Sequence, residues 1–66
     1  MTPDELESEH QALLLEHQTL EAEHRRLEAR PRDFEGHQAH AERLRAHLAR
    51  LHAYVEARRA AGTNHN

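Results

Sequence analysis

The sequence predicts an all-α fold: an antiparallel, coiled-coil-like hairpin of two helices, which pairs with a second hairpin into a four-helix bundle. Three observations support this prediction. Leucines recur every seven residues in the first half of the chain, a proline interrupts the pattern near its middle, and a second apolar repeat with the same period follows. A seven-residue apolar repeat is typical of helices that pack along a shared seam. The 66 residues are enough for one domain.

The first helix is predicted over about residues 3–30. Thr2 can cap it, Pro3 suits the first helical position, and Glu5 completes a capping box. Within this helix, leucines occupy position d of the heptad, histidines occupy position a, and glutamates flank the seam. These residues are Leu6, Leu13, Leu20 and Leu27 at d, His10, His17 and His24 at a, and Glu9, Glu16 and Glu23 beside them.

A loop is predicted over about residues 31–35. Pro31 ends the first helix, because a proline disfavours the α conformation of the residue before it. Asp33 can cap the second helix, with Gly36 in its first turn. A single unbroken helix is the competing interpretation, and the proline and glycine disfavour it because both residues destabilise a helix interior.

The second helix is predicted over about residues 36–61. Gly62 suits a C-terminal cap, and residues 62–66 are expected to fray. The apolar seam of this helix has Ala41, Leu48 and Val55 at position a, and His37, Leu44, Leu51 and Arg58 at position d.

Antiparallel pairing about a turn near Phe34 aligns the two seams in one register. Leu20 then faces Leu48, and Leu13 faces Val55. Residues 1–30 carry eight acidic residues and three arginines, whereas residues 31–66 carry four and six, so the two helices attract each other. Additional leucines widen the apolar stripe beyond one seam, which favours pairing into a bundle. The predicted core and interface residues are Leu6, Leu13, Leu14, Leu20, Leu27, Leu44, Leu48, Leu51 and Val55.

Composition narrows the classes of function. The net charge of −3 provides no basic field for nucleic acid, and no apolar run approaches the length of a membrane span. The acidic, polar beginning of the sequence is unlike a signal peptide, so we expect a cytoplasmic protein. Without cysteine, disulfides and thiolate metal sites are excluded, and self-association is the expected source of stability. A two-helix hairpin has no concave pocket for catalysis, so we expect no enzyme.

Eight histidines in 66 residues allow three interpretations. The position-a imidazoles can pack against leucines and bond to glutamates, they can bind a divalent transition metal such as Zn, Cu or Ni, or they can act as a pH switch. Histidines seven residues apart on one helix are about 10 Å apart, so a shared ion needs ligands from across the interface. The candidate ligands are His10, His17, His24, His37, His40 and His47.

From His17 onward, the order of residue types resembles that of the YdcH-like family of small bacterial helical hairpins. The resemblance rests on His17, Leu20, His24 and Leu27, on Pro31 and Asp33 in the loop, and on the run from Leu44 to Val55. The chain departs from the family pattern at His24, where the family has an aliphatic residue, and at Ala53, where it has Asp. The resemblance implies a hairpin fold and a bacterial cytoplasmic setting, and it implies no activity.

Together these observations predict a small helical module that associates with itself, most simply as a homodimer, or with another helical protein. The alternative is a histidine-rich bundle that binds a transition metal.

Overall fold

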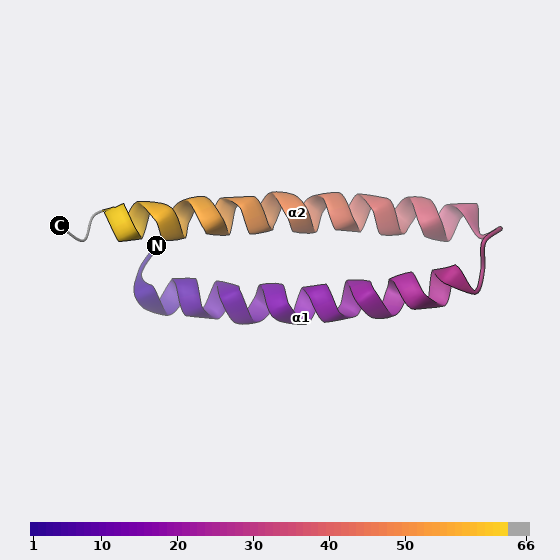
Figure 1. The fold of residues 1–66 in the computed structure, drawn as a ribbon, viewed down its shortest axis with the longest axis horizontal. Coiled ribbons are helices and arrows are strands. Elements are labelled where there is room, and N and C mark those ends of the chain that lie inside the picture. The colour runs from indigo at the N-terminus through magenta and orange to yellow at the C-terminus, as the bar shows by residue number, and fades with distance from the viewer. Residues whose placement is uncertain (64–66) are drawn as a thin grey trace.

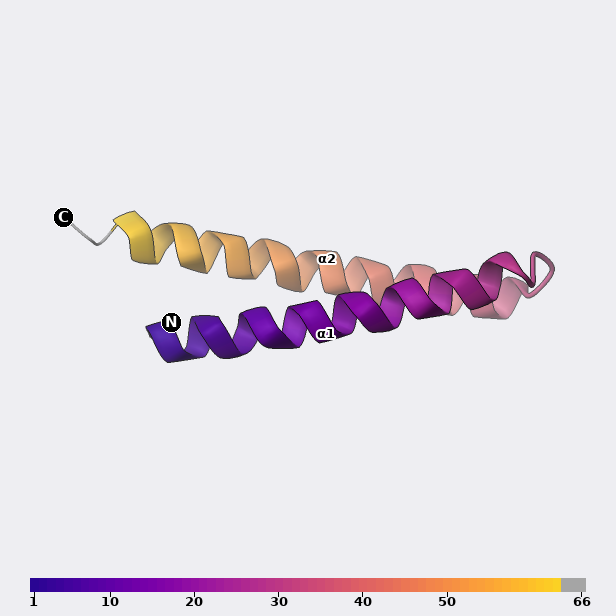
Figure 2. The ribbon, with the colours of Figure 1, turned by 60° about the horizontal axis from the view of Figure 1, so that its bottom comes forward.

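Two antiparallel helices form the whole architecture of the part of the chain that the structure describes. The structure is a computed structural model, and it describes residues 1–63, with only the backbone at Thr63. Helix α1 (Pro3–Glu28) and helix α2 (Phe34–Thr63) lie side by side and are joined at one end by residues 29–33 (Figure 1). A second view shows that they cross at a shallow angle (Figure 2). The predicted helical hairpin is confirmed, and the unbroken helix is excluded.

Helix α1 begins where the sequence predicts. Thr2 is the N-cap, and its hydroxyl oxygen accepts a hydrogen bond from the Glu5 backbone N–H at 3.2 Å. The same hydroxyl donates to the Glu5 carboxylate at 3.1 Å. Satisfying a free N–H in the first turn stabilises a helix by about 1 kcal/mol. Arg25 and Arg26 lie in the last turn, where their positive charge interacts favourably with the negative end of the helix dipole.

Two hydrogen bonds between side chains and backbone stabilise the turn between the helices. The Asp33 carboxylate accepts a hydrogen bond from the Gly36 N–H at 3.0 Å, which confirms the predicted cap. A Cβ on Gly36 would overlap that carboxylate and lie 3.0 Å from Leu27 Cδ2, so a larger residue there would displace the capping carboxylate. Nε2 of His37 donates to the Arg30 carbonyl at 3.0 Å. His37 therefore closes the turn instead of packing in a seam.

Helix α2 is longer than predicted at both ends. It begins at Phe34 and continues through Gly62 to Thr63. The predicted glycine cap at Gly62 does not form, since no glycine in residues 1–63 has a positive φ. The rest of the predicted frayed tail lies outside the described residues.

The core is a single line of side chains between the helices. From α1 it contains Leu13, Leu20 and Leu27, three of the four leucines predicted at position d, while Leu6 is half-buried. From α2 it contains Tyr54 and His47, neither of which was predicted to be in the core. The predicted core residues that are exposed in the hairpin are Leu14, Leu44, Leu48, Leu51 and Val55.

The predicted register of the two helices is therefore wrong. The rings of His10, His17 and His24 lie beside those of Tyr54, His47 and His40, with centroids 6.0, 6.0 and 5.8 Å apart. Each of these partners differs from the one predicted at that layer. The register differs because His40 and His47 turn toward α1, where each bonds a glutamate. This rotation of α2 moves its leucines out of the seam to one side of the helix pair.

Candidate functional site

The helix pair has two unlike sides, and these sides are the surfaces available for function. On one side, the glutamates of α1 face basic residues of α2 across the seam. We call this the charged flank: Glu9, Glu16, Glu23, Arg43 and Arg50, with His40 and His47 reaching it from the seam.

Glu23 anchors the half of the charged flank nearer the turn. Its carboxylate accepts from Nδ1 of His40 at 2.5 Å and from Nε of Arg43 at 3.1 Å, and a second Arg43 nitrogen bonds the other oxygen. Both His40 and Glu23 are largely buried. This two-pronged arginine contact fixes geometry as well as charge, because the guanidinium and carboxylate are both planar.

Glu16 and Glu9 repeat the arrangement toward the open end. Glu16 accepts from Nδ1 of His47 at 2.5 Å and from Arg50 at 3.2 Å. Arg50 also donates to Glu9 at 2.5 Å, and this bond raises the pKa of Arg50 above its already high ordinary value. The attraction predicted between the acidic first helix and the arginine-rich second helix is made by these pairs.

The hydrogen bonds of the charged flank also fix the proton positions on two histidines. A carboxylate only accepts, so Nδ1 of His40 and of His47 carries the hydrogen in each pair. In the described residues no buried side-chain nitrogen or oxygen lacks a partner. Nε2 of each ring, which no protein group binds, is therefore open to water.

Acid is expected to weaken the hairpin through Glu16 and Glu23. The hydrogen bond from His47 holds the pKa of Glu16 below its ordinary 4.5, and the bond from Arg43 lowers that of Glu23. Such carboxyls stabilise the fold above their unfolded pKa, and the contribution is lost as pH falls through the folded value. The thermal midpoint, followed by circular dichroism, should therefore fall between about pH 5 and pH 3.

The double variant Glu16→Gln/Glu23→Gln should flatten this acid dependence. Glu56→Gln is the matched control, because Glu56 is exposed on α2 at 3.3 Å from Arg59. A midpoint that already falls between about pH 7 and pH 5.5 would instead indicate the histidine switch expected from the sequence. That switch required buried imidazoles at position a, but the side chains of His17 and His24 are 61% and 62% exposed.

The opposite side of the helix pair is apolar and rich in histidine. Two shallow grooves run along it, one lined by Leu14, His17 and Leu51 among others, the next by His17, His24 and Leu44 among others. The leucines and valine of α2 are spaced by three or four residues, so they lie on one face of that helix. We call this side the apolar–histidine flank: His10, Leu14, His17, His24, Leu44, Leu48, Leu51 and Val55.

The candidate metal ligands are distributed over three places. Three of them, His10, His17 and His24, lie on the apolar–histidine flank, and His40 and His47 lie in the seam behind them. The remaining candidate, His37, lies at the turn, where it bonds the Arg30 carbonyl, whereas His40 bonds Glu23. Within residues 1–63, no three His, Asp or Glu side chains converge on a point where one ion could be held.

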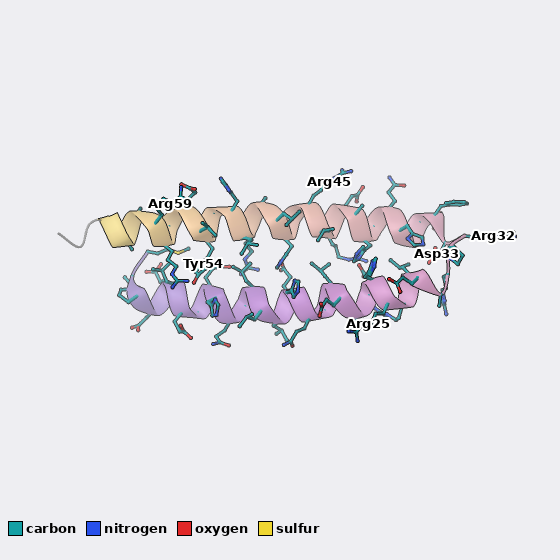
Figure 3. The ribbon with its side chains drawn as sticks, in the orientation of Figure 1. Arg25, Arg32, Asp33, Arg45, Tyr54 and Arg59 are labelled. Atoms are coloured by element: carbon teal, nitrogen blue, oxygen red, sulfur yellow. The ribbon has the colours of Figure 1, made fainter. Side chains whose placement is uncertain are left out.

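The core and charged-flank residues that sequence reasoning missed are Tyr54, Arg43 and Arg50. A signal for them is present, because His40, His47 and Tyr54 are spaced by seven residues and so are Arg43 and Arg50. This second heptad matches the spacing of Glu9, Glu16 and Glu23. Leucine is more apolar than histidine or tyrosine, so hydrophobic periodicity places the leucine repeat in the seam and the polar repeat outside it. Arg25, Arg45 and Arg59 point away from the opposite helix (Figure 3), and Arg25 also lines the groove beside His24.

Comparison of the chain with protein-family models, with curated proteins and with solved structures finds no match. The resemblance to the YdcH-like family therefore stays a prediction. Neither described helix has the length and apolar character that crossing a membrane requires.

Proposed function

We propose that this chain is a self-associating helical module, in which two hairpins pair through their apolar–histidine flanks into a four-helix bundle. One observation carries the proposal: a continuous row of large apolar side chains is exposed on a single side of the hairpin. Leu48 is 53% exposed, and Leu14, Leu44 and Val55 are exposed beside it. Large contiguous apolar patches are uncommon on monomeric proteins and usually mark an interface.

The surface area of the chain agrees with pairing. A compact monomer of 7.7 kDa has an accessible surface of about 4,300 Å², whereas this chain exposes 5541 Å². The excess is about 1,200 Å² per chain, and standard interfaces remove about 800 Å² from each partner. Pairing two hairpins therefore covers an area that suits a stable dimer.

The distribution of charge favours a second copy as the partner. The charged flank is already satisfied within the hairpin by ion pairs from Glu9, Glu16 and Glu23. The apolar–histidine flank is mostly uncharged, although Glu21, Arg25 and Glu28 also line its groove beside His24. Both helices contribute to this flank along their length, so it can pair with itself about a two-fold axis. The net charge of −3 opposes pairing only weakly.

Introducing charge into the apolar–histidine flank is expected to separate the two copies. The double variant Leu44→Glu/Leu51→Glu changes one leucine in each groove. It should change the mass by sedimentation equilibrium from that of a dimer to 7.7 kDa, because burying unpaired carboxylates is costly. Leu15→Glu is the control: Leu15 is 66% exposed, does not line either groove, and should leave the dimer intact.

A parent chain that sediments at 7.7 kDa even at high concentration would contradict self-association. If that monomer also kept its helical content on dilution, the flank would have to serve a different helical protein. The bacterial cytoplasmic setting implied by the family resemblance stays a prediction beside this proposal.

A further inference from the structure

We propose that two imidazole pairs that span the helices, His17 with His47 and His24 with His40, are each a site for one divalent transition-metal ion of the Zn, Ni or Cu class. Both sites lie within one chain, so they do not depend on the dimer proposed above. The argument uses three features of each pair: the ring geometry, the free ring nitrogen and the neighbouring carboxylates.

The two pairs are copies of one arrangement, seven residues apart on each helix. Their centroids are 6.0 and 5.8 Å apart, and the planes are inclined by 32° in both. With metal–nitrogen bonds of about 2.0–2.1 Å, two imidazoles on one tetrahedral ion have centroids roughly 5 Å apart. The observed pairs are within about an ångström of that spacing. The exposed ring on α1 can close the difference by a small rotation about its own torsions.

The buried ring of each pair is prepared as a ligand. His47 and His40 donate Nδ1–H to Glu16 and Glu23, which leaves Nε2 as the lone-pair nitrogen. Histidine ligands of metals nearly always donate their other N–H to a carboxylate or carbonyl, because this fixes the ring and makes the ligand nitrogen more basic. The structure thus contains a carboxylate behind the buried imidazole in both pairs.

The exposed ring of each pair has a carboxylate close to its Nε2. Nε2 of His17 lies 3.7 Å from Glu21, and Nε2 of His24 lies 2.8 Å from Glu28, each four residues along α1. These oxygens are placed beside the pairs, where an ion would gain from their charge. Since no three side chains in the described residues already converge on one point, water completes the coordination.

The third layer of the same repeat pairs His10 with Tyr54 and serves as an internal control for the two histidine pairs. His10 faces Tyr54 at the same 6.0 Å and the same 32° inclination. Imidazole nitrogen suits these metals, whereas a neutral phenol is a poor ligand for them. The layer therefore has the geometry of the other two and lacks the second imidazole, so we expect no ion there.

The test is a calorimetric titration of the full, untagged chain with ZnCl₂ and with NiCl₂ at neutral pH, with thermal melting and sedimentation on the same samples. The expected result is two ions per chain and a raised thermal midpoint, because a ligand that binds only the folded state stabilises it. His17→Ala and His24→Ala should each remove one ion, and the double variant should remove both. These side chains are mostly exposed, so the variants should still fold.

His10→Ala and His52→Ala are the controls, and both should keep two ions. Equal losses in the controls would show adventitious binding by scattered histidines and overturn the proposal. Unchanged binding in the His17→Ala/His24→Ala double variant would overturn it as well. Because sedimentation reports the dimer separately, two ions bound to a 7.7 kDa monomer would support the metal sites and contradict the proposed assembly.

Discussion

Leu20→Ala is expected to lower the free energy of unfolding by about 2–5 kcal/mol, because it leaves a cavity in a core only one side chain thick. Leu20 lies midway along α1 between the two other buried leucines, Leu13 and Leu27. Few neighbours are available to fill the space, since both flanks of the seam open to solvent. Urea denaturation followed by circular dichroism measures the loss, and the variant should be largely unfolded at temperatures where the parent chain is folded.

Leu15→Ala is the matched control for Leu20→Ala. It removes the same atoms from the same helix, but Leu15 is 66% exposed. Substitutions at such positions usually change stability by no more than about 0.5 kcal/mol. Similar losses in the two variants would mean that α1 does not pack along the line of Leu13, Leu20 and Leu27.

Tyr54→Ala is expected to cost about 3–5 kcal/mol, as truncation of a buried aromatic residue usually does. Tyr54 is 8% exposed, and its side chain points from α2 toward α1, where its ring lies beside His10 (Figure 3). Tyr54→Phe keeps the ring and should retain most of the stability. Thermal melting of both variants, at a concentration where the chain is monomeric, gives the comparison.

The same experiment distinguishes the two registers. In the register predicted from the leucines, Leu48 faces Leu20, and Leu48→Ala would be the damaging change. In the observed register Leu48 is 53% exposed, so Leu48→Ala should be mild in the monomer while Tyr54→Ala is severe. The reverse order of effects would restore the leucine register.

The two flanks of this small hairpin contribute in different ways. The charged flank determines how the helices face each other, because Glu16 and Glu23 each bond one histidine and one arginine of α2. Ion pairs at a surface contribute little net stability, so we attribute register to them and not affinity. The apolar–histidine flank is left for a partner copy and, in our further proposal, for metal ions.

Local features of the fold were predictable because they depend on residues close in sequence. The caps at Thr2 and Asp33 and the break at Pro31 follow from hydrogen bonding and backbone sterics within a few residues. The buried face of α1 was also predictable, since a leucine at every seventh position has no competing apolar face there. Of the candidate site, the six histidines were predictable by residue type, but the side chain that each one faces depends on the register of the two helices.

The sequence by itself determined that there are two helices, that Thr2 and Asp33 cap their beginnings, that the chain turns back after Pro31, and that α1 buries its heptad leucines Leu13, Leu20 and Leu27. Only the tertiary structure decided which face of α2 meets α1. Two heptads compete on α2, one of leucine and valine and one of His40, His47 and Tyr54, and periodicity alone ranks the more apolar first. The polar heptad faces α1 because its imidazoles can satisfy glutamates across the seam, an interaction between residues up to 31 positions apart that no local pattern contains.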